Sequence, residues 1–142
     1  MKAEEIQVGH VYFVNFDPTK MGEFNSNHMC VVLKKNRDMI TFVVIPLTSQ
    51  GSGAGVNKIP LYIKPYLPPH LRNKDTYAVY DQVRTVSAKR FSKLNEGDEE
   101  YDTVVPEKEM VRLYEAIISN LTESLSDAQR NELFNALFTE KR

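Results

Sequence analysis

Residues 29–45 read Met-Cys-Val-Val-Leu-Lys-Lys-Asn-Arg-Asp-Met-Ile-Thr-Phe-Val-Val-Ile, and this stretch decides the fold class. Its two apolar runs, 29–33 and 39–45, are rich in the β-branched residues that favour strands. The polar segment 34–38 between them predicts a hairpin turn, and the second strand is expected to end in the segment Pro-Leu-Thr-Ser at 46–49. The stretch therefore predicts two antiparallel strands joined by a short turn.

Outside this hairpin, the alternation of β-branched and aromatic residues predicts further strands. The first covers residues 9–16 and is stopped by Asp17-Pro18. Two more are expected at 59–63 and 77–86, separated by a segment around 65–70 that is too proline-rich for regular structure.

The apolar period changes to that of a helix after Pro106, which suits a first helical position. Glu107 and Glu109 favour the positive end of the helix dipole. The apolar residues then repeat at i, i+3 and i+4: Met110, Leu113, Tyr114, Ile117, Ile118 and Leu121. Ser126 followed by Gln129 has the form of a capping box and predicts a second helix. The fold class expected is mainly β with C-terminal α, a small curled antiparallel barrel with two helices packed against it.

Length and composition bound the class of protein. The chain has 142 residues, 42% hydrophobic and 26% charged, which fits one globular domain over residues 1–142. No apolar run approaches the ~20 residues of a membrane span. The N-terminal residues lack the apolar core of a secretory signal, and the single Cys30 cannot form an internal disulfide. A cytoplasmic protein without membrane association is expected.

The charges are unevenly distributed along the chain. Residues 1–93 carry 13 Lys and Arg against 7 Asp and Glu, a net of +6, whereas residues 94–142 carry 5 against 12, a net of −7. The cationic part could hold a polyanion, although lysines that merely solvate strand edges would give the same count. The acidic part would repel RNA, and its two apolar helical stripes are expected either to support self-association or to pack on their own barrel.

Three motifs in order carry a resemblance to a known family. They are Gly-His-Val-Tyr through Asp-Pro at 9–18, Pro-Leu-Thr-Ser at 46–49, and Asp-Gln-Val-Arg-Thr at 81–85 followed by Lys-Arg-Phe at 89–91. Together they resemble the MazF/PemK family of toxin endoribonucleases of type II toxin-antitoxin systems, over residues 9–121.

The resemblance implies an SH3-like barrel of five to seven strands, a symmetric homodimer and cleavage of single-stranded RNA, such as mRNA, without a metal ion or other cofactor. It also implies an acidic antitoxin as partner. Residues 122–142 are expected to form a helical extension beyond the family core.

In this family the loop after the first strand carries a Glu and, five residues on, an Arg followed by Pro, and the Arg works with the Thr of the Leu-Thr-Ser segment. Glu23 and His28 occupy these spacings here, so His28 stands where the family has Arg and Met29 where it has Pro. The resemblance therefore implies His28 and Thr48 as the catalytic pair.

Metal-free RNA cleavage requires removal of a proton from the 2′-OH, neutralisation of charge on the phosphate and protonation of the leaving 5′-oxygen. His28 could act as base or acid, since an imidazole has an ordinary pKa of ~6.5. Thr48 could donate a hydrogen bond to a phosphate oxygen and Arg84 could supply charge. RNA contacts are also predicted for other residues nearby: Glu23, Asn27, Ser49 and Gln82.

Structural roles explain the same residues without catalysis. His28 could be a polar loop residue, Thr48 could cap the strand end, Arg84 could form an ion pair with Asp81 or Glu23, and Gln82 could be a dimer contact. The aromatic side chains of Phe24, Tyr62, Tyr66 and Tyr77 could stack on unpaired bases, but in so small a barrel core positions are favoured.

Two other functions share the fold and remain alternatives: a catalytically silent barrel that binds RNA or protein, and a toxin directed at gyrase. His and Cys residues show no metal-ligand spacing, and no nucleotide-binding motif is present, so no metal or cofactor is expected.

Overall fold

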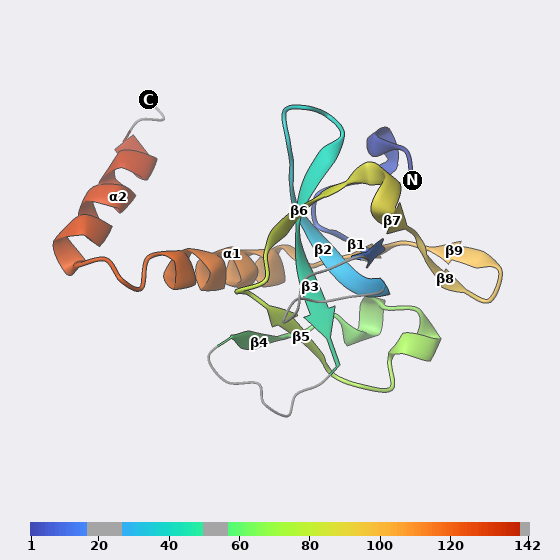
Figure 1. Ribbon diagram of the computed structural model, residues 1–142. Coiled ribbons are helices and arrows are strands. Elements are labelled where there is room, and N and C mark those ends of the chain that lie inside the picture. The colour runs from blue at the N-terminus through green and yellow to red at the C-terminus, as the bar shows by residue number, and fades with distance from the viewer. Residues whose placement is uncertain (17–26, 50–56, 140–142) are drawn as a thin grey trace.

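The computed structural model describes residues 1–16, 27–49 and 57–139, and these contain ten short strands and two α-helices (Figure 1). The strands are β1 (His10–Asn15), β2 (Asn27–Lys35), β3 (Thr41–Thr48), β4 (Lys58–Leu61), β5 (Thr76–Val79), β6 (Arg84–Ser87), β7 (Phe91–Ser92), β8 (Leu94–Glu96), β9 (Glu99–Tyr101) and β10 (Thr103–Val104). The helices are α1 (Glu107–Leu121), α2 (Asp127–Thr139) and the short 3-10 turns η1 (Ala3–Glu5), η2 (Lys64–Tyr66), η3 (Pro69–Leu71) and η4 (Ala88–Arg90).

The predicted hairpin is the centre of the sheet. β2 and β3 pair antiparallel, with Cys30 opposite Pro46 and Lys35 opposite Phe42. On the other side of β2 lies β1, also antiparallel, with Val14 opposite His28. The strands expected at 9–16 and 29–33 are confirmed, and β2 is longer than expected at both ends.

Pro46 lies inside the third strand, which ends within the segment 46–49 as expected from the sequence. β3 continues to Thr48, because Pro46 lies where the strand exchanges one partner for another. The ladder to β2 ends at Pro46, and the ladder to β5 begins at the next residue, Leu47. At this junction the missing proline N–H interrupts neither ladder.

The single strand expected over residues 77–86 is wrong, because a turn divides it into β5 and β6. Both strands run antiparallel along β3, but in different registers. If the β5 ladder continued, Val44 would face Asp81, whereas it faces Arg84. The turn is closed by a hydrogen bond from the Gln82 N–H to the Val79 carbonyl, 3.1 Å long.

The sheet curls, because the short segment 84–92 pairs with β3 at its beginning and with β1 at its end. Between these two pairings lies the turn η4. Within the described ranges the pairings do not run continuously around a closed barrel, so the barrel stays a prediction. A mainly antiparallel β fold with two C-terminal helices is confirmed, with more and shorter strands than the five expected.

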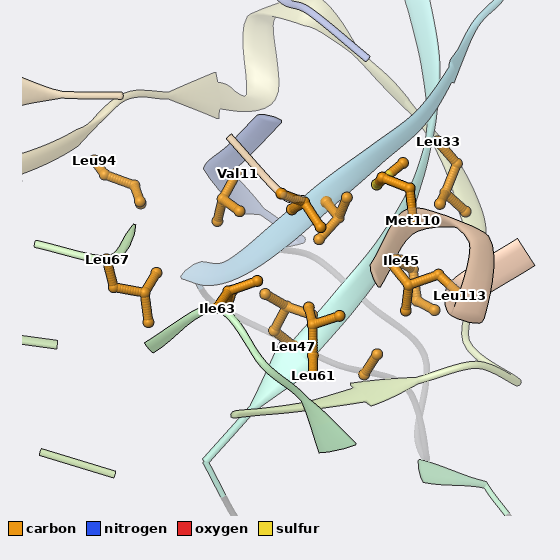
Figure 2. Close-up of a cluster of buried hydrophobic side chains, with 13 residues drawn as sticks. Val11, Leu33, Ile45, Leu47, Leu61, Ile63, Leu67, Leu94, Met110 and Leu113 are labelled. Carbon is orange, nitrogen blue, oxygen red and sulfur yellow. The ribbon is translucent and has the colours of Figure 1, made fainter. Parts of the chain in front are cut away.

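The sheet separates two hydrophobic cores. The first core is drawn in Figure 2. In it, one face of the strands β1, β2 and β3 packs against β4, the short turns after β4 and helix α1. Met110 and Leu113 are the α1 residues buried in it. The second core lies on the other face: Ile6, Tyr12, Val14, Phe16, Cys30, Val32, Phe42, Val44, Val86, Ala88 and Phe91.

Helix α1 follows the expected start, with Pro106 directly before its first residue. Only part of its apolar repeat is buried, because Tyr114, Ile118 and Leu121 remain exposed. Glu109, expected to act through the helix dipole, is instead 2% exposed inside the fold.

Helix α2 has the predicted capping box. The Gln129 N–H donates to Ser126 Oγ over 3.2 Å, and the Ser126 N–H donates to Gln129 Oε1 over 3.0 Å. The helix lies beyond the end of α1, away from the sheet (Figure 1). None of its residues 127–136 is buried, so over these residues α2 does not show the expected packing on its own sheet. In the described part of the chain, no helix has the length and apolar character that crossing a membrane requires.

Candidate functional site

Three of the predicted site residues lie on one face of the sheet. Side chains alternate along a strand, so residues two apart share a face. On β2, His28 precedes Cys30 by two residues, and Cys30 belongs to the second core. By the same alternation Thr48 shares a face with Val44 on β3, and Arg84 with Val86 on β6. His28, Thr48 and Arg84 therefore lie on the same face of the sheet as the second core, at one edge of it.

The turn after β5 is what brings Arg84 to this face. Because of the register change, Arg84 stands opposite Val44, whose side chain is fully buried in the second core. Without the extra residues of the turn, the exposed Asp81 would occupy that position. A carboxylate there would repel phosphate, whereas the guanidinium attracts it.

The ring of Phe16 connects two of the three residues. Its centroid is 6.2 Å from the centroid of the His28 imidazole, and the Arg84 guanidinium carbon lies 4.7 Å from it. Phe16 is only 4% exposed. This buried ring holds the cation by a cation–π contact and limits the positions open to the imidazole. Sequence reasoning missed Phe16, although an aromatic residue directly before Asp17-Pro18 was a visible signal.

His28 and Thr48 lie on neighbouring strands, just beyond the end of the ladder that joins them. The last pair of the ladder between β2 and β3 is Cys30 opposite Pro46, and His28 and Thr48 each lie two residues further on, on the same face of their strands. The two side chains therefore lie on the same side of the sheet, at the same end of the two strands. Both side chains are half-buried.

Arg84 is fixed from a second direction. Its Nη2 donates to Gln82 Oε1 over 3.0 Å, so the two residues of the Asp-Gln-Val-Arg motif form one unit. The amide oxygen of Gln82 accepts this bond, while its NH₂ group is the part that could meet a base.

Cys30 lies underneath the site and is fully buried, as expected for a packing role. Burial raises the pKa of its thiol, and the positive charge of Arg84 opposes this shift. The thiol donates to the His28 carbonyl, with 3.7 Å between sulfur and oxygen. Cys30 is therefore a neutral support of the β2 backbone at His28, and no reactive thiolate.

The remaining predicted residues flank this centre. Asn27 is exposed at the start of β2, opposite Asn15, and Ser49 is exposed directly after β3. Arg90 brings a second cation to this end of β1, because its Nη1 donates to the Asn15 carbonyl over 3.2 Å. Glu23 and Phe24 lie outside the described residues.

In residues 1–16, 27–49 and 57–139, no group of three His, Cys, Asp or Glu side chains is arranged to hold a metal ion. The cationic and proton-transferring groups at the site come from the side chains of His28, Arg84 and Arg90. This set can bind a phosphodiester and exchange protons with it.

The fold and this site define a class of small toxin proteins. The sequence matches, over residues 7–121, the family model described as PemK-like, MazF-like toxin of type II toxin-antitoxin system. The match covers most of the chain, and the protein belongs to this family. The match ends at the last residue of α1, so α2 lies outside it.

Solved structures share the fold at low sequence identity. A crystal structure of MazF from Deinococcus radiodurans is 20% identical with a TM-score of 0.59, and the alignment covers 82% of this chain and 96% of that one. MazF in a MazE–MazF complex from the same organism is 20% identical with a TM-score of 0.55, over 82% of this chain and 95% of that one. A mycobacterial endoribonuclease in complex with its cognate antitoxin is 14% identical with a TM-score of 0.53, over 82% and 94%. No match was found among curated protein sequences.

Proposed function

We propose that this toxin-family protein is an endoribonuclease that cleaves single-stranded RNA without a metal ion. The observation that supports this most is the convergence of His28, Thr48 and Arg84 on one face, with Phe16 between the imidazole and the guanidinium. A histidine that exchanges protons beside a fixed cation and a hydroxyl donor is suited to phosphodiester cleavage through the neighbouring 2′-OH.

Each residue has a distinct role in this reaction. His28 takes the proton from the 2′-OH or returns one to the leaving 5′-oxygen. Arg84 and Thr48 hold the phosphate oxygens on which negative charge increases in the transition state. Relative to an arginine at position 28, an imidazole exchanges protons readily at neutral pH but supplies less permanent charge. Arg84 then carries more of the electrostatic task.

The proposal includes two partners. The structural relatives that are complexes contain MazE or a cognate antitoxin, and an acidic antitoxin fits the net of +6 on residues 1–93 of this chain. The second partner is another copy of the chain, bound through the exposed apolar positions of α1 and α2. The acidic C-terminal part disfavours RNA there, which leaves a protein surface as its occupant.

The deciding experiment is incubation of the full chain with a defined single-stranded RNA in EDTA. Discrete products are expected from the wild type, and His28→Ala should reduce cleavage by about a hundredfold or more while thermal unfolding stays unchanged. His70→Ala is the matched control, because His70 is an exposed histidine that contacts Glu96. The wild-type rate should change with pH near neutrality, and an active His28→Ala enzyme would contradict the catalytic assignment.

Arg84→Ala separates binding from chemistry. Loss of one phosphate contact should weaken RNA affinity and reduce the slope of log affinity against log salt by ~0.7. An unchanged affinity and slope would give Arg84 a structural role. RNA binding without any cleavage by the wild type would instead support the catalytically silent barrel.

A further inference from the structure

A second concave surface lies next to this site and has no role in the proposed chemistry. It is a cleft of about 500 Å³ between β4, β5, the turn η2 and the start of α1. Three tyrosines line it: Tyr62, Tyr66 and Tyr77. Tyr62 is 63% exposed and Tyr66 49% exposed, so the expectation that such aromatics belong to the core is wrong for these two. Figure 1 shows β4, β5 and the short turns η2 and η3 together at one end of the molecule.

The cleft continues from the candidate catalytic site. Thr48 on β3 stands opposite Tyr77 on β5, and Tyr77 stands opposite Pro60 on β4. Directly opposed residues share a face, so these three side chains form a row across three strands. Two residues beyond Pro60 comes Tyr62. With strands ~4.8 Å apart, the row leads from Thr48 into the cleft over ~10 Å.

Tyr62 is held in place although its ring is exposed. The Tyr62 N–H donates to Oε1 of Glu109 over 2.8 Å, and Arg112 Nη1 donates to the same oxygen over 2.7 Å. Arg112 also donates to the Pro60 carbonyl over 3.0 Å, and its guanidinium carbon lies 4.9 Å from the Tyr62 ring centroid. A nearly inaccessible carboxylate thus fixes an arginine against an exposed aromatic ring, which reduces the entropy lost when a ligand stacks on that ring.

The charge around the cleft is positive. Lys64 and Lys108 both line it, against one carboxylate, Asp75. Lys64 Nζ lies 2.9 Å from Asp75 Oδ1, and both side chains are well exposed, at 44% and 74%. Exposed pairs of this kind are weak, so a phosphate can compete for the lysine.

We propose that this cleft is a subsite for an unpaired base that flanks the cleaved phosphodiester of single-stranded RNA. The base stacks on Tyr62 or Tyr66, and Lys64 and Lys108 bind the phosphates beside it. Aromatic faces interleaved with cations are the common means of holding single strands. The inference rests on the proposed function, because it takes the substrate to be RNA. A proline-rich or acidic peptide is the competing occupant, and the row from Thr48 favours RNA.

The test uses the full chain and a non-cleavable RNA with a 2′-deoxynucleotide at the cleavage position. Affinity is measured by fluorescence anisotropy in EDTA. Of the two variants Tyr62→Ala and Tyr66→Ala, the one that removes the stacking ring should weaken binding about fivefold to a hundredfold, since one stacked base is worth that much. Tyr62→Phe keeps the ring and should bind within about twofold of the wild type. Ile40→Ala, which removes an exposed apolar side chain between β2 and β3 and outside the cleft, is the control.

Abasic substitutions on each side of the cleavage position identify the stacked base. One abasic substitution should weaken RNA binding to the wild type. The same substitution should have no effect on binding to the alanine variant that has already lost the stacking ring, because removal of either partner of the stack abolishes the same interaction. The subsite is overturned if both alanine variants bind the RNA as tightly as the wild type. It is also overturned if the alanine variants lose affinity for an acidic peptide but not for the RNA. If the wild type binds no RNA, the proposed function fails as well. If it binds and cleaves RNA while the tyrosine variants behave like it, only the subsite fails.

Discussion

α1 and α2 are consecutive helices of similar length, 15 and 13 residues, with opposite relations to the rest of the molecule. α1 buries Met110 and Leu113 in the first core, and the hydroxyl of Tyr114 donates to the Leu33 carbonyl over 2.6 Å. In α2, the contacts to the body include a hydrogen bond from Arg130 Nε to the Thr122 carbonyl, 3.0 Å long. Tertiary packing therefore holds α1, while capping supports α2 locally.

This difference distinguishes the family fold, which ends with α1, from helix α2, which follows it. The family match ends with α1, which is the last helix with a residue in the first core among the side chains that the structure describes. Because none of residues 127–136 of α2 is buried, we expect removal of α2 to leave the sheet and the site beside His28 intact. The contrast between the two helices can be tested one interaction at a time.

The largest effect is expected from Leu113→Ala, which removes a fully buried side chain of α1 from the first core. The free energy of unfolding should fall by about 2–5 kcal/mol, measured by urea denaturation. The control is Leu121→Ala on the same helix, where the side chain is 72% exposed and the loss should stay within about 0.5 kcal/mol. Equal losses for the two variants would contradict the packing described for α1.

A smaller loss is expected from Glu109→Gln. Glu109 Oε1 accepts hydrogen bonds from the Tyr62 N–H and from Arg112 Nη1, and the charged pair is stronger than its neutral replacement. The free energy of unfolding should fall by about 1–3 kcal/mol. Glu107→Gln, an exposed position in the same first turn, should change it by less than about 0.5 kcal/mol. No difference between the two would mean that Glu109 does not anchor α1 to β4.

The sequence allowed much of the fold to be predicted, because local patterns determine it. β-branched runs located β1 to β3, and the Ser126 and Gln129 pair located the start of α2. The division of residues 77–86 into two strands could not be predicted, because it depends on two different pairing registers along β3. Leu47 pairs with β5 in one register, and Val44 pairs with β6 in the other.

The same limit applies to the candidate site. The motifs gave His28, Thr48 and Arg84, but that they share a face follows from pairing across three strands. The backbone of Tyr62 is held by a hydrogen bond to Glu109, a carboxylate 47 residues away in the chain, and single-sequence patterns carry no information about such a contact.

The smallest effect on the fold is expected from deletion of Ser124 to Arg142, which removes α2. None of its residues 127–136 is buried, so the free energy of unfolding should change by less than about 0.5 kcal/mol. The free energies of unfolding of the parent and the truncated chain are compared at the lowest usable protein concentration, because association with a second copy adds stability by mass action. Light scattering at several concentrations is expected to show a dimeric parent and a dissociated truncated chain, with RNA affinity retained. The exposed positions Ile118, Leu121 and Phe134 are the surface whose burial between two copies would explain that result. A truncated chain as dimeric as its parent would remove α2 from the interface, and loss of RNA affinity on truncation would contradict the separation of the acidic helices from the cationic site.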